Sequence, residues 1–248
     1  MYRIQTFNSI SDKGLTRFTA ERYTVSPDTE NADAILLRSH QLATTALAPN
    51  LRAVARAGAG VNNVPVAECT EQGVVVFNTP GANANAVKEL VLCGLLLASR
   101  GVIPGICFAD SQTEFSDHTE LSKLMEQRKK RYKGNEIAGK TLGVVGLGAI
   151  GSLVAEMAIG LGMEVKGFDP ALSVEAAWRL PNQVERIENL GALVADSDYI
   201  SLHLPVLDST RKLIDASMFA AMSQGTCLLN FARDGIVDSA ALMNALNS

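Results

Sequence analysis

Short apolar runs alternate with turn-rich stretches in the first third of the chain, which is the pattern of buried parallel strands. The runs lie at residues 2–7, 34–37, 53–55 and 74–77. The segments between them, including residues 44–48 and 66–71, are long enough for the short helices that right-handed crossovers between parallel strands require. This part of the chain is therefore predicted to form a small doubly wound domain.

A different pattern covers residues 85–100, where Ala, Val, Leu and Cys follow one another almost without interruption. Lys88 and Glu89 are the only charges inside this run, so it predicts a long, deeply buried helix that links two domains. Residues 110–139, in contrast, are polar and highly charged, which indicates a surface arm or connector.

Strands and helices alternate again from Lys140 onward. Apolar strand-like runs lie at residues 141–146, 164–169, 198–204 and 226–232, and helix-compatible sequence separates them. The expected fold class is α/β, with two doubly wound parallel-sheet domains. We expect the domain boundary between residues 95 and 96, so that the domains span residues 1–95 and 96–248.

A glycine-rich turn follows the strand predicted at residues 141–146. Gly146 permits a tight turn, Gly148 lets the backbone approach a pyrophosphate, and Gly151 allows close packing of the following helix. The free N–H groups at the start of that helix also favour an anion. Glycines that serve packing alone are the alternative, but the register of strand, turn and helix favours dinucleotide binding.

Asp169 closes the next strand about 20 residues later, where a ribose-binding carboxylate is expected. Its carboxylate can accept hydrogen bonds from both ribose hydroxyls, and it repels a 2′-phosphate. No arginine lies in residues 170–177 to offset this repulsion. The predicted cofactor is therefore NAD rather than NADP.

The composition narrows the range of partners. Hydrophobic residues make up 47% of the chain and charged residues 19%, as in ordinary globular proteins. The formal net charge of −4 offers no basic excess, so nucleic acid is not an expected partner. One basic run at residues 128–133 is interpreted as the solvated face of a linker, with a polyanion site as the less favoured alternative.

The 4 cysteines show neither metal-ligand spacing nor the density of a secreted disulfide framework. We therefore expect no metal, and we expect reduced cysteines in a cytoplasmic protein. The first residues lack the features of a signal peptide, and the longest apolar stretch, residues 90–98, is far shorter than the ~20 residues that cross a bilayer. No membrane partner is expected.

The glycine-rich turn, Asp169 and several longer motifs make the chain similar to the D-isomer-specific 2-hydroxyacid dehydrogenases. Five segments in fixed order carry the resemblance, at residues 53–66, 76–90, 168–170, 200–214 and 225–238. Within the family they are most similar to bacterial 3-phosphoglycerate dehydrogenases. The resemblance implies a flavodoxin-like substrate domain, a Rossmann NAD-binding domain, and a homodimer formed through the cofactor domain.

The resemblance assigns Arg233 as the catalytic arginine that holds the carboxylate and carbonyl oxygen of a small-molecule substrate. A planar guanidinium suits this task, because it can grip the substrate bidentately and stabilise negative charge on its oxygen. Arg233 also follows a predicted strand, where open α/β sheets bind ligands. A surface salt bridge is the alternative for this residue.

The predicted substrate loop is Ala57, Gly58, Ala59 and Gly60, whose backbone amides can converge on a carboxylate. An ordinary tight turn is the alternative. Arg38 and Arg56 resemble arginines that meet the phosphate of 3-phosphoglycerate, although a structural ion pair is about equally favoured for each. These two cations favour 3-phosphoglycerate, and hence serine biosynthesis, over glyoxylate or hydroxypyruvate.

His203 ends an apolar strand and invites assignment as a general base. The resemblance implies instead that the segment from His203 to Pro205 lines the nicotinamide side of the cofactor site, with a structural histidine as the alternative. His40 and His118 receive no catalytic role. The full set of expected cofactor contacts is Gly146, Gly148, Ala149, Ile150, Gly151, Asp169, Pro170, His203, Leu204, Pro205, Thr210, Phe231 and Ala232.

Members of the family continue beyond the helix expected at residues 239–246 with a catalytic glutamate and a catalytic histidine. The chain ends at Ser248, so we expect either a fragment of a longer protein or a C-terminally truncated dehydrogenase that binds NAD with little turnover. A non-catalytic NAD-binding scaffold is the alternative from another functional class.

Overall fold

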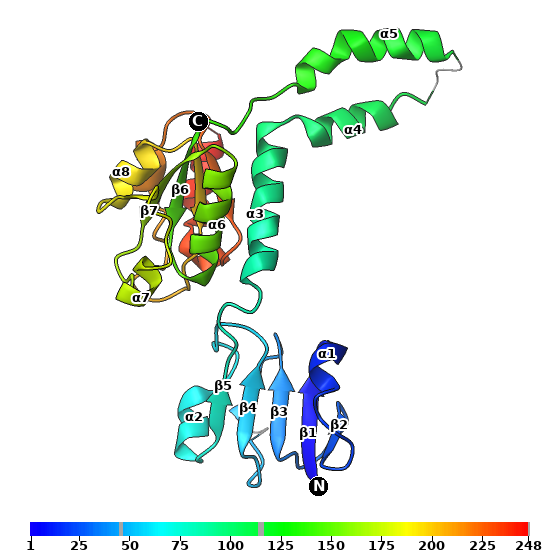
Figure 1. Ribbon diagram of the computed structural model, residues 1–248, viewed down its shortest axis with the longest axis vertical. Coiled ribbons are helices and arrows are strands. Elements are labelled where there is room, and N and C mark those ends of the chain that lie inside the picture. Colours follow the sequence, from blue (N-terminus) through cyan, green and yellow to red (C-terminus); the bar gives the residue numbers. More distant parts are fainter. Residues whose placement is uncertain (45–46, 114–116, 248) are drawn as a thin grey trace. The chain divides into compact units, whose positions relative to one another are not determined.

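The computed structural model describes residues 1–44, 47–113 and 117–247. The chain divides into two compact units, Met1–Asn83 and Ala84–Ser248. Figure 1 shows a sheet in each unit. The boundary precedes the helix α3 (Ala84–Ser99), whereas we expected it between residues 95 and 96, inside that helix. The difference arises because α3 packs along its length against the second unit.

The first unit is a parallel sheet in the order β2-β1-β3-β4-β5. Its strands are β1 (Tyr2–Phe7), β2 (Tyr23–Ser26), β3 (Ala34–Leu37), β4 (Ala53–Arg56) and β5 (Val75–Phe77). The order is that of flavodoxin-like sheets, as predicted. The sequence pattern did not reveal β2, which is half-exposed at the sheet edge.

Among the described residues of this unit, the helices α1 (Asp12–Leu15) and α2 (Val66–Glu71) accompany the sheet. The helix α2 was predicted, whereas the short helix expected at residues 44–48 includes residues 45 and 46, which lie outside the described residues. The core includes Leu37 of β3 and Val54 of the adjacent strand β4, and both are fully buried. It holds the carboxyl ends of these strands, and therefore Arg38 and Arg56, in fixed places.

The helix α3 is buried on one side only, which corrects the prediction of a deeply buried helix. Val91 and Leu95 are fully buried in the core of the second unit, whereas Leu90 is 55% exposed and Leu97 is 40% exposed. The uniform apolar sequence conceals this division because it lacks the polar stripe that normally marks a solvent-facing side.

Residues 101–133 contain more regular structure than their polarity suggested. The helix α4 (Val102–Asp110) is followed by α5 (His118–Arg128) and the 3-10 helix η2 (Lys129–Tyr132). Tyr132 closes the base of this arm, because its ring stacks on Phe108 and its carbonyl accepts the Gly101 amide. No single helix in the described ranges is long and apolar enough to span a membrane, and α3 and α4, which pass that test only together, are bent by 67°.

The sheet of the second unit has the order β10-β9-β6-β7-β8, all parallel. Its strands are β6 (Thr141–Val145), β7 (Glu164–Phe168), β8 (Glu185–Arg186), β9 (Tyr199–Leu202) and β10 (Cys227–Asn230). Every strand except β8 matches a predicted run. The order reverses beside β6, and such a switch point is where open α/β sheets bind ligands.

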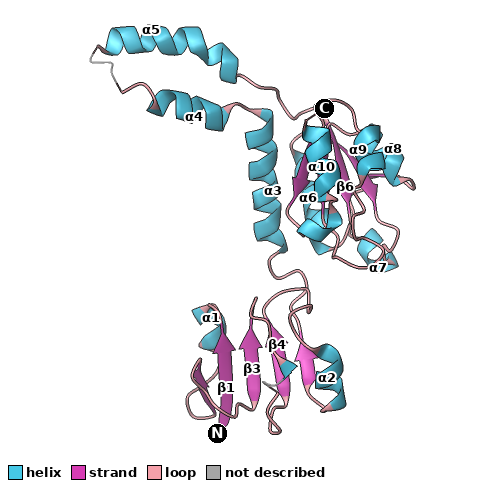
Figure 2. Ribbon diagram, turned by 180° about the vertical axis from the view of Figure 1, so that it is seen from behind, coloured by secondary structure: helices cyan, strands magenta, loops and turns pink. Residues whose placement is uncertain are grey.

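Helices cover both faces of this sheet (Figure 2). The helices α3 and α6 (Ala149–Gly160) contact each other and share one core with Leu142 and Val144 of β6. The opposite core contains Val145 with the helices α8 (Leu190–Ala195), α9 (Ala216–Ala221) and α10 (Ser239–Leu246). Burial on both faces explains why β6 reads as a continuous apolar run. The short helix α7 (Val174–Ala177) follows β7.

Candidate cofactor and substrate sites

The glycine-rich turn joins β6 to α6, and two of its glycines are required by close backbone contacts. Gly146 has φ of +92°, and a Cβ there would lie 2.8 Å from the carbonyl oxygen of His203. A Cβ on Gly151 would lie 1.9 Å from the carbonyl oxygen of Gly146. Any side chain at either position would therefore push the turn, the helix and the end of β9 apart.

Gly148 differs from these two, because a Cβ at this position would meet no described protein atom within 4 Å. It is the N-cap of α6, with φ of −69°, a value that other residues adopt readily. The amides of Ala149 and Ile150 follow in the first helical turn, where N–H groups have no intrahelical acceptor. The open space at Gly148 thus lies beside a group of donors suited to an anion.

Asp169 follows β7 and both of its carboxylate oxygens are held by backbone amides. One oxygen accepts from the Leu147 amide at 2.9 Å, and the other accepts from the Ala171 amide at 2.9 Å. These bonds orient the carboxylate beside the glycine-rich turn. Each oxygen retains acceptor capacity, so the group can still bind the two hydroxyls of a ribose.

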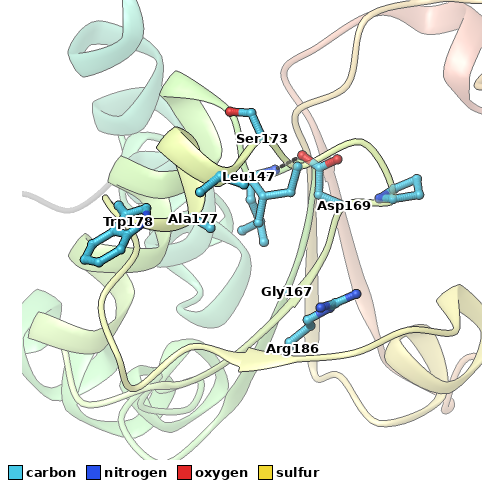
Figure 3. A pocket seen from close by; sticks show the side chains of 10 residues that line it. Leu147, Gly167, Asp169, Ser173, Ala177, Trp178 and Arg186 are labelled. Carbon is cyan, nitrogen blue, oxygen red and sulfur yellow. Dashed lines mark hydrogen bonds between the residues drawn. The ribbon is translucent and has the colours of Figure 1, made fainter.

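A cavity of about 530 Å³ opens beside this carboxylate (Figure 3). It is lined by Leu147, Gly167, Asp169, Pro170, Leu172, Ser173, Val174, Ala177, Trp178 and Arg186. The mixture of apolar walls and a carboxylate matches the needs of an adenosine, whose base is flat and whose ribose carries hydroxyls. Asp169 and Pro170 were predicted from the sequence, whereas Trp178 and Arg186 were not.

His203 continues the sheet beyond β9, since its amide donates to the carbonyl of Val145 at 2.7 Å. Its Nε2 lies 2.8 Å from Oγ of Ser201, which is fully buried. Burial lowers the pKa of His203 to about 4, so the ring is neutral at neutral pH. This geometry agrees with a structural or wall position for His203.

Thr210 fixes the loop that follows. Its hydroxyl donates to the carbonyl of Pro205 at 2.6 Å and accepts from the amide of Leu207 at 2.8 Å. Leu204 packs toward the glycine-rich turn, where a Cβ on Gly146 would lie 2.8 Å from its side chain. The predicted segment from residue 203 to residue 205 is thereby brought against the turn.

A turn at the end of β10 presents Arg233. The side chain of Asn230 donates to the carbonyl of Arg233 at 2.8 Å and accepts from the amide of Ala232 at 3.1 Å. The guanidinium is exposed and donates to the carbonyl of Ala232 at 2.7 Å. Among the described residues it forms no ion pair, so the alternative of a surface salt bridge is not observed there.

Phe231, predicted as a cofactor contact, lies partly against α3. A Cβ on Gly94 would be 3.1 Å from the Phe231 ring, and the residue remains 37% exposed. The glycine on α3 therefore makes room for this ring. The exposed remainder of the ring is the part that a ligand can reach.

Arg38 and Arg56 are brought together in the first unit, at the ends of the adjacent strands β3 and β4. Nε of Arg56 donates to the carbonyl of Arg38 at 3.0 Å. The buried side chain of Asn63 donates to the same carbonyl at 3.2 Å and to the carbonyl of His40 at 2.7 Å. The backbone that carries Arg38 is thus fixed by two donors.

The guanidinium of Arg56 lies over the predicted substrate loop, since a Cβ on Gly58 would be 2.5 Å from its Nη1. Two amides of the loop are already engaged: Ala57 donates to Leu37 and Gly58 donates to Arg56. Among the described contacts, the amides of Ala59, Gly60 and Val61 donate no backbone hydrogen bond, so these three remain for a ligand. The expectation that the whole segment presents free amides is corrected in this respect.

Residues 108–248 match the family profile "D-isomer specific 2-hydroxyacid dehydrogenase, NAD binding domain". The match covers more than half of the 248-residue chain. The chain belongs to the D-isomer specific 2-hydroxyacid dehydrogenase family. The matched residues include the glycine-rich turn, Asp169 and Arg233, and the cofactor of the matched domain is NAD.

Individual relatives agree with the family. The chain is 36% identical over 220 residues to D-3-phosphoglycerate dehydrogenase of Methanocaldococcus jannaschii, and the alignment covers 88% of this chain and 39% of that protein. It is 38% identical over 213 residues to hydroxypyruvate reductase of Thermotoga maritima, and this alignment covers 85% of this chain and 63% of that protein. The crystal structure of the TT0316 protein from Thermus thermophilus superimposes on this chain with a TM-score of 0.81 at 27% sequence identity. The superposition covers 99% of this chain and 78% of that one. The chain thus spans about two fifths of the length of the first relative.

Three residues that lie at or beside the candidate sites were not predicted from the sequence, for different reasons. Asn230 precedes the predicted arginine in a turn-forming pattern, and that signal was available. Trp178 and Arg186 carried no local signal, because they approach Asp169 only through the fold. Other predicted residues divide between the units: the cofactor set and Arg233 lie in the second, and Arg38, Arg56 and residues 57–60 lie in the first.

Proposed function

We propose that the chain carries the NAD-binding and substrate-orienting parts of an oxidoreductase that transfers a hydride between NAD and a D-2-hydroxy acid. The observation that carries this proposal is the open space at Gly148 beside a turn to which Asp169 is hydrogen-bonded. NAD supplies the hydride acceptor when it is bound. The residues of this chain bind and orient the reactants.

The first turn of α6 is proposed to hold the pyrophosphate, through the amides of Ala149 and Ile150 and the space at Gly148. Asp169 is proposed to accept the ribose hydroxyls, with Pro170 beside it. The remaining expected contacts, on the nicotinamide side, are His203, Leu204, Pro205, Thr210, Phe231 and Ala232. Their place beyond the carboxyl ends of β9 and β10 supports this assignment.

Arg233 is proposed to hold the substrate's carboxylate and its reacting oxygen. Its exposure, and the absence of an ion pair among the described residues, leave the guanidinium available for a bidentate contact. Asn230 positions it by fixing the turn. A fixed cation at this point stabilises the negative charge that develops on the substrate oxygen.

For the substrate we propose 3-phosphoglycerate, oxidised to 3-phosphohydroxypyruvate, and with it a role in serine biosynthesis. The two arginines at adjacent strand ends support a substrate with two anionic groups, because guanidinium groups bind phosphate and carboxylate oxygens well. A smaller 2-oxo acid such as glyoxylate or hydroxypyruvate is the second candidate, favoured by the similarity to the Thermotoga protein.

Calorimetric titration with NAD tests the cofactor site directly. Gly148→Val should reduce NAD affinity at least about tenfold, because the side chain fills the space beside the α6 amides. Gly160→Ala is the matched control, since Gly160 ends the same helix and a Cβ there meets no described atom within 4 Å. Equal NAD affinity in both variants would refute the site.

NADH production tests the reaction, in the longest form of the protein that carries this chain. We expect turnover of 3-phosphoglycerate to exceed that of D-glycerate, with Arg56→Gln reducing the difference, since a charged hydrogen bond is worth about 1.5–3 kcal/mol. Tight NAD binding without turnover of any 2-hydroxy acid would instead support the non-catalytic scaffold.

We also propose a homodimer formed through the second unit. The helix α4 carries Val102, Ile103 and Ile106 at 44%, 51% and 51% exposure, an apolar surface suited to a partner subunit. Sedimentation velocity should show a dimer, and Ile103→Glu with Ile106→Glu should dissociate it.

We propose a reducing, cytoplasmic location for the protein. The free cysteines support it: Cys69, Cys93, Cys107 and Cys227.

A further inference from the structure

We propose that Arg186 is a second determinant of cofactor choice: it is the cation of the adenosine cavity, and it is placed to bind a 2′-phosphate that Asp169 normally excludes. This inference rests on the proposed NAD site and extends it. Arg186 lies outside residues 170–177, the stretch directly after Asp169, which contains no arginine.

The sheet places the two side chains on one face. Arg186 on β8 is the register partner of Gly167 on β7, and Asp169 lies two residues after Gly167. Register partners, and residues two apart on a strand, point to the same side of a sheet. Diagonal neighbours of this kind are about 7–8 Å apart at the backbone, within reach of an arginine side chain.

The cavity confirms that this shared face is open. Both Asp169 and Arg186 line it, and Figure 3 shows Gly167 between them in that view. Because Gly167 has no side chain, nothing from that position fills the space between the carboxylate and the guanidinium. Leu147 and Val184 occupy part of it, since a Cβ on Gly167 would lie 2.8 Å from the Leu147 side chain and 3.1 Å from the Val184 side chain.

Arg186 is not committed to a strong interaction within the protein. Its guanidinium lies 3.5 Å from the carboxylate of Glu188, and the two side chains are 80% and 82% exposed. Exposed pairs of this kind contribute little and exchange readily with water. A doubly charged phosphate in the cavity would compete well for this cation, because guanidinium groups bind phosphate oxygens bidentately.

Asp169 and Arg186 therefore have opposing effects on a 2′-phosphate. The carboxylate is held against the ribose position by the Leu147 and Ala171 amides, so its repulsion dominates in the natural protein. Removing that charge should uncover the attraction of Arg186. NADP binding by an Asp169 variant should then depend on Arg186 more strongly than NAD binding does.

The test is a double-mutant cycle with calorimetric titration of NAD and NADP. The proteins are the natural chain, Asp169→Ser, Arg186→Gln and the double variant, with Arg131→Gln as an exposed arginine control on η2. Trp178, the 1 tryptophan of the chain, lines the cavity and supplies a fluorescence readout of binding at the adenosine end. Where serine lowers the melting temperature, Asp169→Asn replaces it, because it retains an oxygen acceptor for the Leu147 amide.

We expect the Asp169 variant to bind NADP more tightly than the natural chain does. Adding Arg186→Gln to that variant should weaken NADP binding at least about tenfold and should change NAD binding less. NADP binding should also weaken more steeply with salt when Arg186 is present. An NADP affinity that is the same with and without Arg186, or no gain in the Asp169 variant, would overturn the inference. Failure of the natural chain to bind NAD would instead refute the proposed function.

Discussion

The carboxylate of Asp169 accepts a hydrogen bond from the backbone amide of Leu147, with a donor–acceptor distance of 2.9 Å. This bond joins the end of β7 to the glycine-rich turn after β6. The residue proposed to recognise the ribose therefore also fixes the turn that faces the pyrophosphate. Changes at Asp169 consequently affect both folding and cofactor choice, and the two effects need separate measurements.

Asp169→Ala should lower the free energy of unfolding by about 1–3 kcal/mol, because the amides of Leu147 and Ala171 lose their acceptor. Asp169→Asn should cost less, since one oxygen acceptor remains. Urea denaturation measures both, with Asp208→Ala as an exposed control. Equal stability of Asp169→Ala and the control would show that the carboxylate does not fix the turn.

Gly151→Ala should destabilise the second unit by about 1–3 kcal/mol, because the added carbon would lie 1.9 Å from the Gly146 carbonyl oxygen and the backbone must shift. Gly160→Ala on the same helix should leave stability unchanged or slightly raised, since alanine favours helices. Thermal denaturation distinguishes them. A neutral Gly151→Ala would contradict the close contact between turn and helix.

Asn63→Asp should destabilise the first unit more than Asn63→Ala does. The amide of Asn63 is buried and donates to the carbonyls of Arg38 and His40, so a carboxylate there would face two acceptors without a proton to share. We expect a loss of about 2 kcal/mol or more at neutral pH. The neighbouring exposed Asn62→Asp is the matched control, and similar losses in both would argue against the hydrogen bonds described for Asn63.

His203 should make the protein less stable as the pH falls from about 6.5 to about 4. The unfolded imidazole has a pKa of about 6.5, and burial lowers the pKa of the folded one to about 4. Between these values only the unfolded chain binds the proton, so stability is complete above pH ~6.5, declines below it, and levels off near pH ~4.

The loss attributable to His203 can reach about 3 kcal/mol at the low end of this range. His203→Gln should remove that part of the pH dependence, and His118→Gln, at the exposed start of α5, should not. Denaturation curves at about pH 7.5 and about pH 5 test this. An unchanged pH dependence in His203→Gln would show that the imidazole is not buried as described.

Structural features that depend on residues close together in the chain could be predicted from the sequence. The glycine-rich turn was recognised because strand, glycines and helix follow one another directly, and the structure gives Gly146 the positive φ that such a turn needs. The long strands were predicted because burial on both faces makes each a continuous apolar run. Arg38 and Arg56 were singled out through the family resemblance, and the structure places them at the ends of the adjacent parallel strands β3 and β4.

Tertiary contacts determine which surfaces are covered and which residues distant in sequence meet, and local sequence patterns do not encode them. The apolar run of α3 does not reveal that Val91 faces α6 while Leu90 stays exposed, because the division is made by the partner helix. The strand β8 has only 2 residues and no periodicity, and it exists through pairing with Gly167. Arg186 therefore reaches the cavity of Asp169 through a pairing of strands far apart in sequence, which no local pattern of hydrophobic and polar residues encodes.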